Sequence, residues 1–253
     1  MSRIGLVGTG HIAAPIARFL AARGHAVTVT RRSEAVSAAL AQSHGIAVLG
    51  SAQAVVDACE IVFLCLRPQQ AEAVIAPLTF RADHAVVSVM AGVSEAALRG
   101  WCAPAARLVQ TIPFGFLEQG GCPLAAYGDA ALLDGLFAPV NPVIPVASEA
   151  ALNQHFAISA MLPGLLDLMV TARDWLVERT GDDSGAERYV AQLAGGFLAS
   201  LDATEPGILE RERDALATPG TLSLQMTTGL RAGGAHRALS DTLSAIGTRL
   251  EGR

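Results

Sequence analysis

The chain has 253 residues, about half of them hydrophobic, and a formal net charge of −5. This length suits one large domain or two smaller ones, and the composition supplies ample material for a core. The negative charge and the lack of a basic cluster larger than two arginines argue against nucleic-acid binding. The sequence has no run of 18 or more apolar residues without a charge, so we expect no membrane span. The first residues form no signal-peptide pattern, so we expect a cytoplasmic protein.

The first half of the chain alternates between short apolar segments and segments with helical periodicity. The continuous apolar run at residues 61–66 is typical of a parallel strand that is buried on both faces. The alternation predicts an α/β fold, with an N-terminal Rossmann-type, doubly wound and mostly parallel sheet. The expected strands are 4–7, 26–30, 48–49, 61–66, 85–90, 107–111 and 124–127, and the expected helices are 11–23, 33–43, 51–58, 71–77 and 94–100.

The character of the sequence changes near Pro145, after which only helical periodicity follows. We therefore expect two domains, 1–148 and 149–253, of which the second is all-α. The longest predicted helix, 151–179, has little polar face, and a helix that is apolar all round is buried on all sides. This predicts a homodimer through the helical domain; a helix at the centre of its own bundle is the alternative. Further helices are expected at 186–201, 208–217, 222–232 and 236–250.

Three residue types limit the possible chemistry. All 18 basic residues are arginine, so no lysine can form a Schiff base or act as a general acid. The histidines are scattered without the spacing of metal ligands, so we expect no metal site. The four cysteines form no CxxC pair, which predicts free, buried thiols, at Cys59, Cys65, Cys102 and Cys122.

A glycine motif, Gly8-x-Gly10-x-x-Ala13, lies between the first strand and the first helix. In a strand–helix–strand unit, the first glycine permits a tight turn, the second lets the backbone approach a pyrophosphate, and the small third residue lets the helix pack on the strand. The N–H groups at the helix start then face the phosphates. The motif predicts a dinucleotide site, rather than an ordinary turn, on residues Gly8, Thr9, Gly10, His11, Ile12 and Ala13.

The second strand ends in Arg31, Arg32 and Ser33 instead of the carboxylate that accepts the ribose 2′-hydroxyl of NAD. Because arginine pairs well with phosphate, often through two hydrogen bonds, we predict NADP(H), with both arginines on the 2′-phosphate. A solvated pair of loop arginines is the alternative.

With these features the chain resembles the pyrroline-5-carboxylate reductase family along nearly its whole length. The matching segments are IGLVGTGHIAAPIA, TRRSE, EIVFLCLRPQ, VVSVMAGVS, RLVQTIPFGF and TPGTLSLQMTTGLRAGG. The resemblance implies a Rossmann domain, a helical domain that interleaves with a second subunit, and hydride delivery from NADPH to a C=N bond, as in proline biosynthesis.

By position, the resemblance also implies residues around the nicotinamide half of the cofactor. These are Leu66, Arg67 and Pro68 beside the ribose and ring, Ala91 and Gly92 on the carboxamide through backbone groups, and Ile112 and Pro113 as a wall.

The substrate half departs from the family pattern. The family's Lys-Pro-Gln is Arg67-Pro68-Gln69 here, its Met-Pro-Asn is Ile112-Pro113-Phe114, and its Ser-Pro-Gly-Gly-Thr-Thr is the segment from Thr218 to Ser223. Leu222 replaces a hydroxyl that the family offers to the substrate, and a site without such a donor binds a polar substrate poorly. Another imine or a carbonyl compound therefore remains open beside pyrroline-5-carboxylate.

The candidate proton donors are Ser223 and Ser159, followed by His155 and His11, although each also suits an ordinary structural role. Two other functions compete with an imine reductase. The 3-hydroxy-acid dehydrogenases use a lysine that this chain lacks. A non-catalytic NADPH-binding protein or sensor stays open, because the substrate loop is altered.

Overall fold

The computed structural model describes residues 1–31 and 34–252. The chain divides into two compact units: the first comprises residues 1–157 and the C-terminal residues from Gly247 on, and the second comprises Ile158–Ile246. The division between domains at residue 148 stays a prediction.

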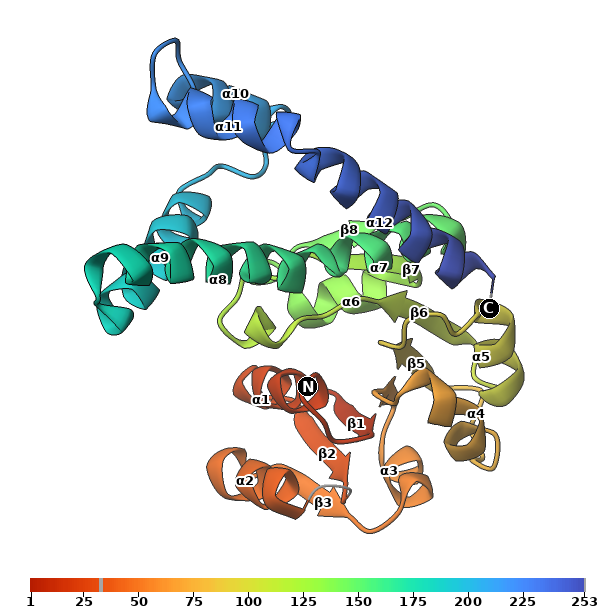
Figure 1. The fold of residues 1–253 in the computed structure, drawn as a ribbon. Helices are drawn as coiled ribbons and strands as arrows, with labels where there is room; N and C mark the ends of the chain where they lie inside the picture. Colours follow the sequence, from red (N-terminus) through yellow and green to blue (C-terminus); the bar gives the residue numbers. More distant parts are fainter. Residues whose placement is uncertain (32–33, 253) are drawn as a thin grey trace. The chain divides into compact units, whose positions relative to one another are not determined.

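The first unit is built on one eight-stranded sheet with the order β3-β2-β1-β4-β5-β6-β7-β8 (Figure 1). All neighbouring strands are parallel except β6 and β7, which are antiparallel. This confirms the doubly wound, mostly parallel sheet. The strands are β1 (Arg3–Val7), β2 (Ala26–Thr30), β3 (Ala47–Leu49), β4 (Ile61–Leu64), β5 (Ala85–Ser88), β6 (Arg107–Thr111), β7 (Leu124–Gly128) and β8 (Val143–Pro145).

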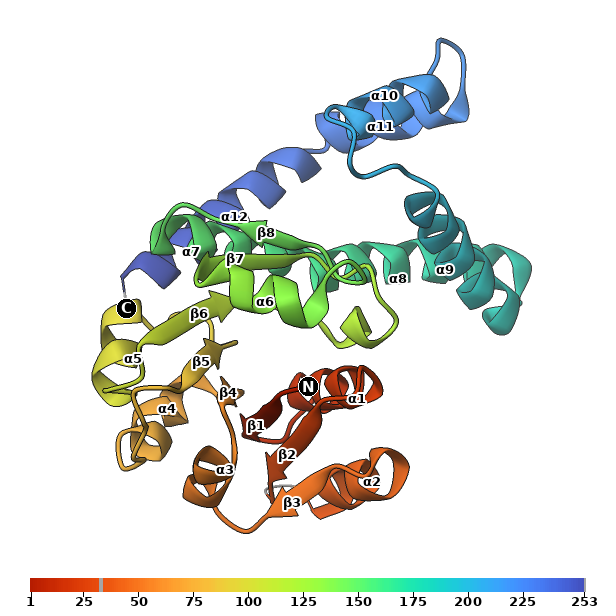
Figure 2. The ribbon, with the colours of Figure 1, turned by 180° about the vertical axis from the view of Figure 1, so that it is seen from behind.

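Helices cover both faces of this sheet, as the two opposite views show (Figures 1 and 2). One core cluster joins the strands to α1, α2 and α6, and the other joins them to α3, α4 and α5. The helices of the unit are α1 (Ala13–Ala22), α2 (Glu34–His44), α3 (Ala52–Ala58), α4 (Pro68–Ile75), α5 (Glu95–Trp101), α6 (Ala130–Phe137) and α7 (Glu149–Ser159), with a 3-10 turn at Gly115–Glu118.

The central strand β4 explains why its sequence is continuously apolar. Phe63 packs in the cluster under α1, α2 and α6, while Val62 and Leu64 pack in the cluster under α3, α4 and α5. Alternate side chains of a strand point to opposite faces, and here both faces are covered. All three side chains are fully buried, which is worth about 1.5–3 kcal/mol for each large apolar side chain.

The prediction of one long helix at 151–179 is wrong in one respect. The structure has two helices there, α7 and α8 (Met161–Thr180), which are interrupted at Ala160. Pro163 lies just after the interruption. Since proline has no N–H, it cannot donate to the carbonyl four residues earlier, whereas it is tolerated in the first turn of a new helix.

The second unit contains α8, α9 (Asp183–Ala199), α10 (Ile208–Leu216) and α11 (Leu222–Ala232), and most of α12 (Ala235–Glu251). Helices α8 and α11 have no buried residue. Large apolar side chains are instead exposed throughout the unit, among them Leu166, Leu168, Trp175, Tyr189, Leu193, Leu198, Leu209, Leu222 and Met226. By length and composition alone, the helical stretch Glu149–Thr180 is also apolar enough to cross a membrane.

Candidate functional site

The turn between β1 and α1 can only be made with glycine at position 8. Gly8 has a φ of +96°, and a Cβ atom there would lie 2.4 Å from the carbonyl oxygen of Cys65. The turn therefore touches the backbone that follows β4, at the place where the strand order reverses from β1 to β4. In open α/β sheets, ligands bind outside the carboxyl ends of the strands at this reversal.

Gly10, two residues on, has no such constraint from the protein. Within the described residues, a Cβ atom at Gly10 would meet nothing within 4 Å, so this part of the chain leaves open space over the Gly10 backbone. Ile12, at the N-cap of α1, receives no side-chain cap, and the first helical bond runs from the N–H of Ala14 to the carbonyl of Gly10.

Within the described residues, no acceptor is found for the N–H groups of residues 10–13. Free N–H groups at a helix start attract an anion. An open glycine followed by unpaired donors fits the diphosphate of a dinucleotide, which would approach Gly10 and accept from these donors. Ala13 is buried and packs into the core under α1, as a small residue at this point of the motif requires.

A hydroxyl from β2 holds the same turn, and the glycine motif does not predict it. The N–H of Gly8 donates to Thr30 Oγ1 at 3.0 Å, and Thr9 Oγ1 donates to the carbonyl oxygen of Thr30. Both threonines are buried. The only signal in the sequence was the threonine at the end of a strand, which is too common to indicate this role. Thr30 thus orients the turn, and its hydroxyl and carbonyl oxygens both accept hydrogen bonds from within the protein.

The tip of β2 is only partly described. Arg31 is exposed, and its N–H donates to the carbonyl of Leu49 on β3 at 2.9 Å. Its guanidinium therefore projects from a backbone that the sheet holds in place. Arg32 and Ser33, the other predicted contacts of a 2′-phosphate, lie outside the described residues.

The predicted nicotinamide-side residues follow the carboxyl ends of β4, β5 and β6. Leu66 is buried, and Arg67 is the exposed N-cap of α4, with Pro68 in its first turn. Ala91 and Gly92 are half-buried in the loop after β5, and Ile112 and Pro113 are buried after β6. The three strands are neighbours in the sheet, so these segments lie along one edge next to the Gly8 turn.

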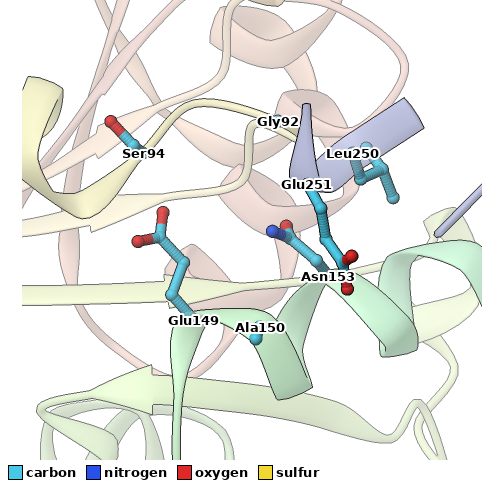
Figure 3. A pocket seen from close by; sticks show the side chains of 7 residues that line it. All are labelled: Gly92, Ser94, Glu149, Ala150, Asn153, Leu250 and Glu251. Atoms are coloured by element: carbon cyan, nitrogen blue, oxygen red, sulfur yellow. The ribbon is translucent and has the colours of Figure 1, made fainter. Parts of the chain in front are cut away.

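Two cavities border the loop after β5. One, of about 370 Å³, lies between Pro68 at the start of α4 and Trp101 at the end of α5. The other, of about 230 Å³, is lined by Gly92, Ser94, Glu149, Asn153 and Glu251 among others. Figure 3 shows the acidic and amide side chains of this second cavity coming from α7 and α12, across from the loop. Gly92 is thus accessible from two sides.

The candidate proton donors are divided between the two units of the chain. His11 is exposed beside the Gly8 turn, and His155 is exposed on α7, with Nδ1 2.8 Å from the carbonyl oxygen of Ala151. Ser159 is the last residue of α7, and Ser223 lies in the first turn of α11. Both serines belong to the second unit. Ser223 lines a surface pocket of about 390 Å³ there, next to Leu222, which is 84% exposed.

The environment of the cysteine thiols makes them poorly reactive. All four are free, and three are buried while Cys65 is half-buried by its neighbours. Burial raises the pKa of the Cys65 thiol to about 12, and it does the same to Cys102. Both therefore stay protonated at neutral pH and are poor nucleophiles. Over the described part of the chain, no group of three or more potential metal ligands comes together.

The chain is similar to known oxidoreductases in sequence. The family model described as NADP oxidoreductase coenzyme F420-dependent matches residues 3–92. The chain is 26% identical over 267 aligned positions to the pyrroline-5-carboxylate reductase of Pisum sativum, across 97% of this chain and 94% of that protein.

Solved structures share the fold over nearly the whole chain. The 1-pyrroline-5-carboxylate reductase of Streptococcus pyogenes superimposes with a TM-score of 0.82 at 21% identity, covering 100% of this chain and 99% of that chain. The reductive aminase of Aspergillus terreus in complex with NADPH and ethyl levulinate reaches 0.65 at 19% identity, covering 99% of this chain and 93% of that one.

Proposed function

We propose that this chain is a member of the pyrroline-5-carboxylate reductase family and an NADPH-dependent reductase of the C=N bond of a small substrate. The observation that carries this proposal is the β1–α1 turn: Gly8 is required by the protein itself, whereas the open space at Gly10 and the unpaired donors after it suit a diphosphate.

The chain's own residues supply the rest of a cofactor site. The N–H groups of residues 10–13 would bind the diphosphate, and Arg31 with Arg32 and Ser33 would bind the 2′-phosphate. Leu66, Arg67 and Pro68 would border the ribose and ring. Ala91 and Gly92 would meet the carboxamide through their backbone, and the buried pair Ile112 and Pro113 would wall the ring and exclude water.

When bound, NADPH supplies a hydride to the imine carbon. The product amine also needs one proton on nitrogen, so that the C=N double bond becomes a C–N single bond with one new hydrogen on each atom. An iminium substrate brings that proton with it. For a neutral imine, the hydroxyl of Ser223 would donate it, and Ser159 is the second candidate. Because the chain has no lysine, a lysine ammonium group cannot be the donor.

The substrate is proposed to be less polar than pyrroline-5-carboxylate. In the loop from Thr218 to Ser223, the hydroxyl of Thr221 donates to the carbonyl of Thr218 and caps α11 by accepting from the N–H of Leu224. The exposed side chain that follows it is Leu222. An alkyl group in place of a hydroxyl favours an apolar substituent over a carboxylate.

We further propose a homodimer through the second unit, in the cytoplasm. Helix α8 buries none of its residues within the chain, and large exposed apolar patches mark interfaces. Protein is a better cover than lipid, because α8 carries Asp167 and Asp174, and Arg173 pairs with Glu187 on α9 at 2.8 Å. Charged side chains are costly within a bilayer.

The deciding experiment measures NADPH binding by calorimetry and NADPH oxidation against a panel of cyclic imines, keto acids and aldehydes. Binding together with turnover of an imine supports the proposal. Tight NADPH binding without turnover of any imine would instead indicate the binding protein or sensor. A chain that binds neither NADPH nor NADH would refute both.

A further inference from the structure

The loop between β5 and α5 is held in place on one side of Gly92 and left free on the other. Val93 is buried, and its carbonyl oxygen accepts a hydrogen bond from Gln110 Nε2 on β6 at 2.8 Å. Next, the N–H of Glu95 donates to Glu149 Oε1 on α7 at 2.8 Å. These side chains come from strands and helices that are themselves part of the packed first unit.

Between this anchored part and the end of β5 lie Ala91 and Gly92. Gly92 has a φ of +69°, a conformation that favours glycine. Within the described chain, no hydrogen bond is found for the backbone N–H and C=O groups of these two residues. They are half-buried and lie between two cavities. Half-buried backbone groups without a partner are available to a ligand.

Gln110 is unusual for its surroundings. It is 3% exposed, on the face of β6 that packs toward α5, and Oε1 has no partner within the described residues. Burying an amide with one unpaired oxygen is unfavourable by itself. The bond from Nε2 to Val93 is therefore the feature that accounts for an amide at this position, where neighbouring Leu108 and Val109 are apolar.

We propose that Gln110 is a positioning residue: by fixing Val93, it holds the free backbone groups of Ala91 and Gly92 in the orientation that binds the carboxamide of the nicotinamide ring. The inference rests on the proposed NADPH-dependent function, and it assigns to Gln110 an effect on the nicotinamide half of the cofactor alone. The loop follows β5, and β4 lies between β5 and the strand that precedes the Gly8 turn. We therefore expect this loop to contact the nicotinamide half of the cofactor and not the diphosphate at the turn.

The test compares two ligands in wild-type protein and in Gln110→Met, which keeps the length of the side chain but removes the donor. NADPH carries the nicotinamide, whereas 2′-phosphoadenosine 5′-diphosphoribose has the remainder of the cofactor without it. We expect the Kd for NADPH to rise about tenfold, as for loss of one buried hydrogen bond, and the Kd for the fragment to stay unchanged. Thr111→Val is the matched control, because it removes a buried hydroxyl from the next residue of β6 for which the described part of the chain offers no partner. Both ligands should bind to this variant as to wild type.

A second measurement needs no variant. Bound NADPH should slow hydrogen exchange at the amides of residues 91–92 in the wild-type protein, and the fragment should not. Three results would each overturn the inference: an equal loss of affinity for both ligands in Gln110→Met, no loss for either ligand, or unchanged exchange at these amides when NADPH is bound. None of them would contradict NADPH binding by the wild-type protein. Wild-type protein that binds neither ligand would overturn the proposed function and the inference together.

Discussion

Two glycine substitutions distinguish a residue that stabilises the fold from a residue that makes room for the cofactor. In Gly8→Ala, the new methyl group would lie 2.4 Å from the carbonyl oxygen of Cys65 and 3.0 Å from Leu66 Cδ2, at a φ of +96°. The positive φ costs about 1–2 kcal/mol, and relieving the overlap costs about 1–3 kcal/mol more. At about 2–4 °C per kcal/mol for a unit of this size, the Tm should fall by roughly 4–20 °C.

Gly10→Ala is the matched variant, because its methyl group meets no atom of residues 1–31 and 34–252 within 4 Å. Its free energy of unfolding should stay close to that of wild type. If a diphosphate lies against Gly10, however, the methyl group occupies the ligand's place, and the Kd for NADPH should rise at least tenfold, or about 1.4 kcal/mol.

Thermal denaturation followed by circular dichroism, and calorimetric titration with NADPH, measure the two effects. Wild-type affinity for NADPH in Gly10→Ala would refute the placement of the diphosphate. A Gly8→Ala protein as stable as wild type would refute the assignment of Gly8 to the fold.

Four other variants test separate features. Arg31→Glu combined with Arg32→Ala should weaken NADPH binding and improve NADH relative to it, since a carboxylate repels the 2′-phosphate; equal changes in the two dissociation constants would contradict the assignment. Leu222→Thr should raise any activity on pyrroline-5-carboxylate, measured as kcat/KM, and no change would mean that this loop does not discriminate. Burial lowers the pKa of His84 below its usual 6.5, so the unfolded chain binds its proton more readily and stability should decline as the pH falls below 6.5; His84→Asn should make urea denaturation less sensitive to pH in that range, and an unchanged pH dependence would exclude His84 as a source. Leu193→Asp, on an α9 side chain that is 60% exposed, should shift the protein from dimer to monomer in light scattering, and a monomeric wild type would contradict the proposed dimer.

Local patterns predicted much of the first unit and one helix of the second. Strand β2 and strand β6 lie where the apolar runs placed them, and helix α11 has the predicted bounds. Gly8 takes the turn that the spacing of its motif requires. These features depend on neighbouring residues, so periodicity and glycine spacing are enough to locate them.

Other elements of the first unit were missed because they depend on partners far along the chain. Strand β8 has three residues, too few for a period, and it exists through pairing with β7. The antiparallel direction of β7 is likewise set by its pairing with β6, since a strand's sequence does not state its direction. Helix α6 was missed as well, although Asp129 caps its first turn.

By itself, the sequence determined most strands and helices in their order along the chain, the glycine turn and the resemblance to a reductase family, because each depends on residues close together along the chain. Only the tertiary structure decided how the turn is clamped by Thr30 and how the loop after β5 is held by Gln110 and Glu149. These hydrogen bonds join residues 22, 17 and 54 positions apart, and no local pattern of side chains specifies which of many polar residues will meet across the folded sheet.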